Sequence, residues 1–261
     1  MKDWKDNVYF VLVEPREAGN IGAAARAIKN MGFKNLCLVN PPSDLSDAAL
    51  FAHNAMDILN ASKIYASFED AVRGMDLVAG TTRRRGRRRG AFIPVEKAAM
   101  QIAEAASVNK VAVLFGREDR GLYNEEVNGC GFLMTIPASK KQPSLNLAQS
   151  VVIIAYELSK ADPARNQKKA KDSDGVMLEA SAPRFVSQQE LSRLYKRMEK
   201  ALRMIEYIPA GNEHHARKIM QNMKHCLGRV GLTDWEYNMF HGICGHIEKK
   251  MGMTGRDLPH K

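Results

Sequence analysis

Short apolar runs rich in β-branched residues alternate with segments whose apolar residues recur every three or four positions, up to about residue 160. The runs predict β-strands over residues 8–14, 35–40, 76–81, 110–116 and 132–137. The helical spacing predicts helices over residues 20–31, 95–106 and 145–159. Such alternation is typical of an α/β fold whose mostly parallel sheet carries helices on both faces.

The pattern changes after residue 160. The next twenty or so residues are rich in Lys, Asp, Ser, Ala and Pro and lack apolar periodicity, as in a linker. Ser187 and Glu190 then form a capping-box pattern at the start of a predicted helix, and two more helices are expected over residues 213–227 and 234–250. We therefore predict an α/β domain over residues 1–160, a linker over 161–183 and a small all-α C-terminal domain over 184–261.

Charge changes this picture by pointing to a partner. The 261 residues include 39 Lys and Arg against 29 Asp and Glu, a formal net charge of +10, which favours a polyanion such as RNA. Mutual repulsion among six arginines in one short stretch disfavours folding, and bound phosphates would offset this repulsion. The six are Arg83, Arg84, Arg85, Arg87, Arg88 and Arg89. A solvated basic loop without a specific role is the alternative interpretation.

The same composition argues against membranes and metals. No apolar run approaches the roughly 20 residues that span a bilayer, and the N-terminal segment lacks the features of a signal peptide, so we expect a cytoplasmic protein. The four cysteines are far apart and form no Cys-x-x-Cys pair. His241, Cys244 and His246 fit the spacing of no structural zinc module, so no bound metal is expected.

Candidate chemistry begins where the first predicted strand meets its helix, at Asn20-Ile21-Gly22-Ala23-Ala24-Ala25-Arg26. A glycine-containing turn that opens a helix presents backbone N–H groups to an anion, although tight packing of strand and helix explains the glycines equally well. A dinucleotide site is the rival interpretation. It fails because the spacing is Gly-x-x-Gly and the second strand ends at Val39-Asn40-Pro41, without a ribose-binding acid.

Two further segments follow predicted strands. Phe115-Gly116-Arg117-Glu118-Asp119-Arg120-Gly121-Leu122 is a dense charged turn at the end of a buried strand, where parallel sheets bind ligands. A plain turn would account for its glycines but not for its charges. The third segment is Ser144-Leu145-Asn146-Leu147-Ala148, in which helix capping alone could explain Ser144 or Asn146.

These three segments, together with Val78-Ala79-Gly80-Thr81-Thr82, resemble the motifs of the SpoU/TrmH branch of the SPOUT methyltransferases, and within it the TrmJ-like tRNA methyltransferases. The resemblance covers about residues 7–160 and is looser in the helical tail. It implies S-adenosylmethionine as the cofactor, a C-terminal trefoil knot in the catalytic domain that forms the cofactor pocket, a homodimer, and a tail that helps to hold tRNA. Nothing in periodicity or composition predicts a knot.

The resemblance also implies roles for individual residues. Those expected to bind the cofactor are Thr81, Thr82, Gly116, Ile136, Ser144 and Leu145. Those expected at the catalytic centre are Arg26, Asn20, Ser144 and Asn146. Because an arginine is almost never deprotonated, we interpret Arg26 as a fork that grips the adjacent phosphate and stabilises the developing alkoxide. Arg16 and the arginine run are expected to bind RNA.

The implied reaction is methylation of a ribose 2′-hydroxyl in RNA, with position 32 of the tRNA anticodon loop as the leading target. Another tRNA ribose or an rRNA ribose is the first alternative. A non-catalytic RNA-binding protein on the same fold is the second, but it predicts erosion of Arg26 or of the segment from Ser144 to Asn146, and both are intact.

Overall fold

A computed structural model describes residues 3–83, 92–139, 141–161, 182–228 and 231–253. Its first part is an α/β unit built on one seven-stranded sheet of order β3-β2-β1-β6-β4-β7-β5. Every strand pair in the described sheet is parallel. The strands are β1 (Val8–Val13), β2 (Asn35–Val39), β3 (Lys63–Tyr65), β4 (Leu77–Thr81), β5 (Phe92–Pro94), β6 (Val111–Phe115) and β7 (Phe132–Thr135).

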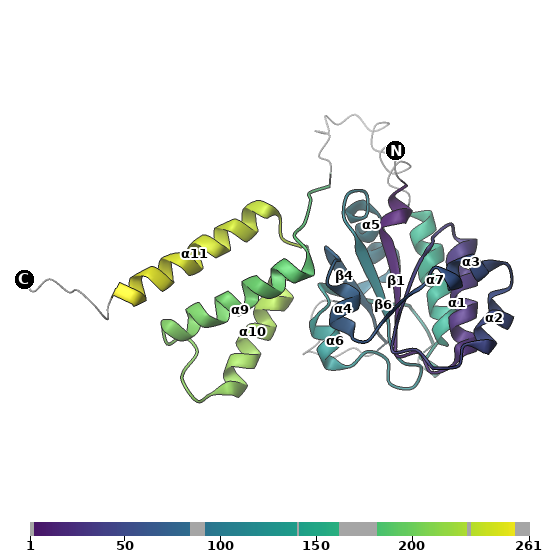
Figure 1. Cartoon of the computed structure of the whole chain (residues 1–261), viewed down its shortest axis with the longest axis horizontal. Coiled ribbons are helices and arrows are strands. Elements are labelled where there is room, and N and C mark those ends of the chain that lie inside the picture. The colour runs from purple at the N-terminus through teal and green to yellow at the C-terminus, as the bar shows by residue number, and fades with distance from the viewer. Residues whose placement is uncertain (1–2, 84–91, 140, 162–181, 229–230, 254–261) are drawn as a thin grey trace, which may run out of the picture.

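Helices cover both faces of this sheet. In Figure 1, α1 and α7 lie on one side of the strands and α4 and α6 on the other. A 3-10 turn, η1 (Trp4–Asn7), precedes β1, and a second, η2 (His53–Ala55), lies between α2 and α3. The helices of this unit are α1 (Ala18–Asn30), α2 (Ser46–Ala52), α3 (Met56–Asn60), α4 (Phe68–Val72), α5 (Val95–Ala105), α6 (Asn124–Asn128) and α7 (Leu147–Lys160).

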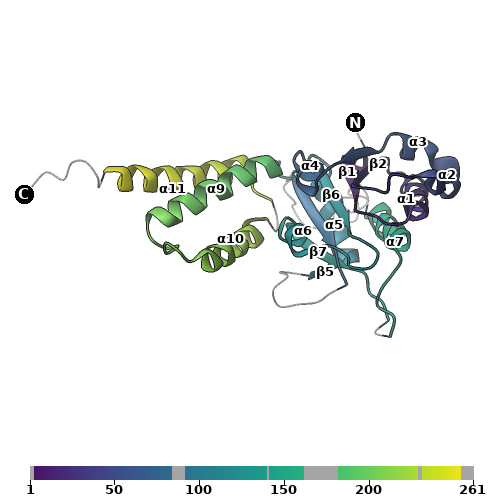
Figure 2. The same ribbon diagram turned by 60° about the horizontal axis from the view of Figure 1, so that its bottom comes forward.

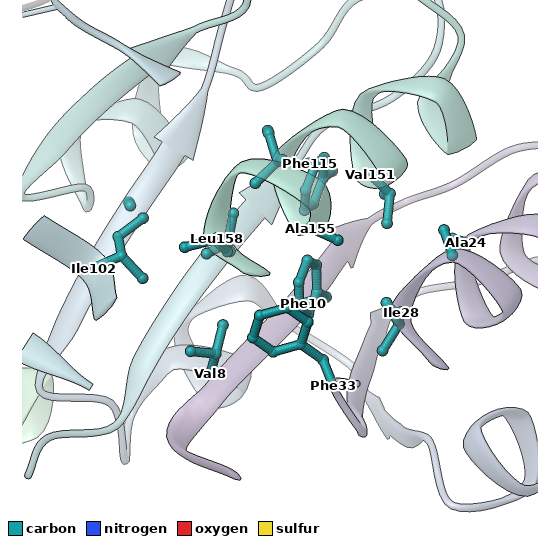
Figure 3. Packing of buried hydrophobic residues seen from close by; sticks show 14 of the residues in the cluster. Val8, Phe10, Ala24, Ile28, Phe33, Ile102, Phe115, Val151, Ala155 and Leu158 are labelled. Carbon is teal, nitrogen blue, oxygen red and sulfur yellow. The ribbon is translucent and has the colours of Figure 1, made fainter. Parts of the chain in front are cut away.

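Two hydrophobic clusters fill the space between the sheet and its helices. The larger packs α1, α5 and α7 against the sheet, and Figure 3 shows Phe10 among side chains of α1 and α7. The smaller, on the opposite face, joins Val11, Val78 and Leu114 to α4 and α6. Because both faces are buried, the central strands are continuous apolar runs and do not alternate apolar with polar residues.

The predicted strands and helices of this unit are observed, with ends that differ by one or two residues. The sequence prediction missed β3 and β5, which are the three-residue strands at the two edges of the sheet, and the short helices α2, α3, α4 and α6. The missed strands have only three residues, and the missed helices have five to seven, which is less than two helical turns; neither length establishes a hydrophobic period of its kind.

The described residues after 181 form α9 (Gln188–Met204), α10 (Glu213–Gly228) and α11 (Asp234–Met253), which pack on one another around a third apolar cluster. The Ser187 hydroxyl and the Glu190 carboxylate make the predicted capping box at the start of α9. Figure 2 shows the three helices extending away from the sheet. The first N–H groups of α9 contact the α/β unit: Gln188 donates to the Met75 carbonyl at 2.8 Å and Gln189 to the Arg73 carbonyl at 3.2 Å.

None of the helices in the described ranges is both long and apolar enough to cross a membrane. Across the same ranges, no three His, Cys, Asp or Glu side chains gather as a metal site would require. The four cysteines are free thiols.

Candidate functional site

A pocket opens at the carboxyl ends of β4, β6 and β7, the edge where parallel sheets bind ligands. All six residues predicted to bind a cofactor lie in its wall: Thr81, Thr82, Gly116, Ile136, Ser144 and Leu145. Leu122 and Met134 add apolar surface, while Glu118 and Asp119 add carboxylates. Three segments that are far apart in the chain therefore meet at one cavity.

The turn after β6 forms one side of this pocket and depends on close backbone packing. The Gly121 N–H donates to the Arg117 carbonyl at 2.7 Å, which closes the turn. A Cβ on Gly116 would lie 2.1 Å from the Gly121 carbonyl carbon, so no side chain fits there. Gly121 itself has φ +67°, the left-handed region that favours glycine. The glycines that the sequence placed in a ligand-binding turn are thus required by the path of the backbone.

Asn20 and Asn146, both predicted to be catalytic, are brought into direct contact. The Asn146 Nδ2 donates to Asn20 Oδ1 at 2.9 Å, and Asn20 Nδ2 donates to Glu118 Oε1 at 3.0 Å and to Glu17 Oε2 at 3.1 Å. Asn146 also caps α7, because its Oδ1 accepts the Ala148 N–H at 2.8 Å. The capping role and the contact with Asn20 therefore coexist in one side chain.

Glu118 links the turn after β6 to the start of α1. Its carboxylate accepts the backbone N–H of Arg16 at 3.0 Å and of Glu17 at 3.4 Å, in addition to the Asn20 side chain. Sequence reasoning placed Glu118 in a charged turn but gave it no role. Its partners lie about a hundred residues earlier in the chain, so local sequence gave no signal of this link.

Arg117 is a second residue whose role the sequence did not predict. Its buried guanidinium pairs with Glu14, at the end of β1, and with Glu126, in α6. The hydrogen bond from Arg117 is the main reason that the pKa of Glu14 lies below its ordinary value. The turn after β6 is therefore tied to both neighbouring segments by charged side chains.

Arg26 and Ser144 are placed differently from the two asparagines. Ser144 is exposed at the rim of the pocket. Arg26 is exposed on the third turn of α1 and does not line the pocket. Within the described parts of the chain its side chain makes no hydrogen bond or ion pair, so its guanidinium is available to an external anion.

The residues predicted to bind RNA are only partly accounted for. Arg16 is exposed, and its Nη1 lies 3.0 Å from Asp119 Oδ2, so part of its charge is already paired. Arg83 is exposed and lines the pocket. The predictions for Arg84, Arg85, Arg87, Arg88 and Arg89 lie outside the described residues.

The chain matches a known family and several known proteins. Residues 7–156 match the SpoU rRNA Methylase family. The curated tRNA (cytidine/uridine/adenosine-2′-O-)-methyltransferase TrmJ of Pseudomonas aeruginosa is 34% identical over 258 residues, 98% of each chain. The tRNA (cytidine/uridine-2′-O-)-methyltransferase TrmJ of Escherichia coli K12 is 34% identical over 94% of this chain and 96% of its own.

Solved structures agree with these matches. The crystal structure of TrmJ from Z. mobilis ZM4 superposes with a TM-score of 0.74 at 27% identity, over 92% of this chain and 98% of that one. A probable methylase family protein from Haemophilus influenzae superposes with a TM-score of 0.60 at 30% identity, over 96% and 99% of the two chains.

Proposed function

Because the chain belongs to the SpoU methylase family, we propose that it is an S-adenosylmethionine-dependent tRNA methyltransferase that modifies a ribose 2′-hydroxyl, at position 32 of the anticodon loop. The observation that carries the proposal is that Thr81 and Thr82 meet the second and third motif segments at one pocket, and that Asn20 of the first motif is hydrogen-bonded to Glu118 and Asn146 of those segments. Full-length relatives named as tRNA 2′-O-methyltransferases support tRNA as the substrate.

The residues around the pocket fit S-adenosylmethionine. Leu122, Met134 and Ile136 offer apolar surface suited to adenine, and the hydroxyls of Thr81 and Thr82 suit a polar sugar. The carboxylates of Glu118 and Asp119 suit a ligand that carries positive charge. When bound, this cofactor supplies an electrophilic methyl group.

We assign Arg26 to the ribose that receives the methyl group. A guanidinium stays protonated at neutral pH, so it acts as a donor and not as a base. It grips the phosphate next to the target nucleotide and stabilises the negative charge that develops on the ribose oxygen, while the proton leaves to phosphate or water. The lack of an internal partner for Arg26 in the described chain supports this role.

Asn20 and Asn146 join the part of the site that faces the RNA to the part that binds the cofactor. Asn20 belongs to the first turn of α1, the helix that also carries Arg26, and Asn146 begins the helix that follows the pocket segment. Their hydrogen bond fixes the distance between the acceptor side and the cofactor side. Ser144, at the rim, contacts the cofactor or the target ribose.

Three finer features of the proposal concern architecture. Residues 1–160 form the catalytic domain, with a trefoil knot around the pocket, and residues 184–261 form an all-α domain; separate apolar clusters support this division. The predicted linker over residues 161–183 lies almost entirely outside the described residues. The protein is a homodimer, and the half-exposed Tyr156 on α7 supports an interface there. Sedimentation of wild type and Tyr156→Glu tests the dimer, which the charge should weaken.

The reaction is tested by methyl transfer from labelled S-adenosylmethionine to bulk tRNA, followed by nuclease digestion and mass spectrometry of the nucleosides. We expect a ribose-methylated nucleoside from the anticodon loop. Arg26→Ala should lower the rate at least about 100-fold without weakening cofactor binding. Arg73→Ala, which removes an exposed arginine at the end of α4 that does not line the pocket, is the matched control.

Other outcomes distinguish the alternatives. Label on rRNA but not on tRNA would keep the chemistry and move the target. No label on either RNA, together with no heat of S-adenosylmethionine binding in calorimetry, would contradict the enzyme and leave an RNA-binding protein on the same fold.

A further inference from the structure

The side chain of Arg117 lies inside the protein with only 4% of its surface exposed, although it belongs to the turn that lines the pocket. Its Nε donates to Glu14 Oε2 at 2.8 Å. Its two terminal nitrogens donate to the two Glu126 oxygens at 3.1 and 2.9 Å. The Tyr123 ring covers one face of the guanidinium, with its centroid 3.8 Å from Cζ.

These contacts leave Arg117 little capacity for a ligand. A guanidinium has five N–H donors, and the contacts with Glu14, Glu126 and the Gly121 carbonyl engage four of them. Burial alone would lower the pKa of Arg117, but its hydrogen bonds with Glu14 and Glu126 outweigh that effect and raise the pKa. The group is thus a permanently charged internal brace and is not positioned to grip phosphate or cofactor.

The brace acts on the wall of the pocket. The Arg117 carbonyl accepts the N–H that closes the turn, and Gly116 and Glu118, its neighbours in sequence, both line the cavity. Glu14 and Glu126 come from opposite sides, one from the end of β1 and one from α6. Arg117 therefore fixes the turn against both of these elements.

We infer that Arg117 is a positioning residue that preforms the cofactor pocket, so that its bonds to Glu14 and Glu126 determine cofactor affinity and not the rate of methyl transfer. The inference rests on the proposed placement of S-adenosylmethionine in this pocket. A preformed wall spares the cofactor the entropic cost of ordering the turn when it binds. The effect appears in Kd and KM, and disappears when the cofactor is saturating.

The test is Arg117→Lys, which keeps the charge but cannot bond to both carboxylates as a fork. Calorimetry should show that the Kd for S-adenosylmethionine rises about tenfold, while single-turnover transfer at saturating cofactor stays within about twofold of wild type. Arg73→Lys makes the same substitution at an exposed arginine that pairs with Asp70, and should leave both quantities unchanged.

Glu14→Gln keeps the test decisive if Arg117→Lys does not fold. Glu14 is 44% exposed and the change removes only the charge from one bond, so the protein should fold and its Kd should rise about threefold. An unchanged Kd in a folded Arg117→Lys or in Glu14→Gln overturns the inference. So does a decrease that is seen only in the rate of methyl transfer at saturating cofactor. Wild-type protein that binds no S-adenosylmethionine would instead contradict the proposed function.

Discussion

The loops around the pocket and the three C-terminal helices are stabilised by different kinds of contact. Around the pocket, the buried side chains of Asn20 and Arg117 bond to carboxylates that are far away in the chain, Asn20 to Glu118 and Arg117 to Glu14. In the described part of the helical region, the buried side chains are apolar, as Leu191 and Leu194 are. Apolar burial stabilises without fixing direction, whereas buried hydrogen bonds fix orientation. Substitutions in the first region should therefore affect function more than stability, and in the second the reverse.

The largest expected effect is on the stability of the helical region. Leu194 on α9 is fully buried, so Leu194→Ala leaves a cavity and should cost about 2–5 kcal/mol of unfolding free energy. Urea denaturation followed by circular dichroism measures this loss. Leu50→Ala, at a leucine that is 70% exposed, is the matched control and should change little.

The same variant tests the separation of the two regions. Calorimetry on Leu194→Ala should give the wild-type Kd for S-adenosylmethionine, because no residue of α9 lines the pocket. A cofactor affinity that fell together with helical stability would mean that the regions do not differ in the way proposed.

A smaller effect, on activity alone, is expected at Asn146. Aspartate caps a helix as well as asparagine does, so Asn146→Asp should preserve the α7 cap. It cannot donate to Asn20 Oδ1, and the lost bond at 2.9 Å should lower methyl transfer about tenfold. Single-turnover assays and thermal denaturation on one preparation measure both quantities.

Asn146→Ala separates the two roles of the residue. It removes the cap as well as the bond to Asn20, so it should lose activity and also about 1 kcal/mol of stability. Full activity in Asn146→Asp would show that the hydrogen bond between Asn146 and Asn20 does not contribute to methyl transfer.

The sequence predicted the α/β sheet because its central strands and long helices carry enough apolar residues to establish a period. The family resemblance singled out six residues that the structure brings to one pocket, at the edge where the preceding strands end; their binding of the cofactor stays a prediction. The bonds between the segments were not predictable. Glu14 pairs with an arginine 103 positions later, and only the folded topology brings β1 beside β6.

For Arg26 the sequence is more informative than the structure. The motif singled it out, but the structure places it outside the pocket wall with no partner in the described chain. A side chain whose proposed partner is RNA makes no contact within the protein that would indicate its role. Its role therefore depends on the methylation assay, whereas the roles of Asn20 and Asn146 can be argued from their hydrogen bonds.

The smallest expected effect concerns a polar cluster that joins α9 to α11. His241 Nδ1 accepts a hydrogen bond from Arg197 at 2.8 Å, and Arg197 also pairs with Glu248. Burial, followed by the charge of Arg197, lowers the pKa of His241 below its ordinary 6.5, although Glu248 opposes the shift. Because the unfolded chain takes up the proton at higher pH than the folded one, this contribution to stability is complete above pH 6.5 and is lost as pH falls below it.

We therefore expect the Tm of wild type to fall between pH 7.5 and pH 5.5 by roughly 1–2 °C more than that of His241→Gln, which keeps an acceptor for Arg197 but does not titrate. The carboxylates Glu14 and Glu248 titrate below their ordinary value of 4.5, outside this window. Calorimetric scans at both pH values measure the difference. Equal shifts in the two proteins would mean that burial and the charge of Arg197 do not keep His241 neutral in the folded protein, and that this polar cluster adds no pH-dependent stability to the apolar packing of the helices.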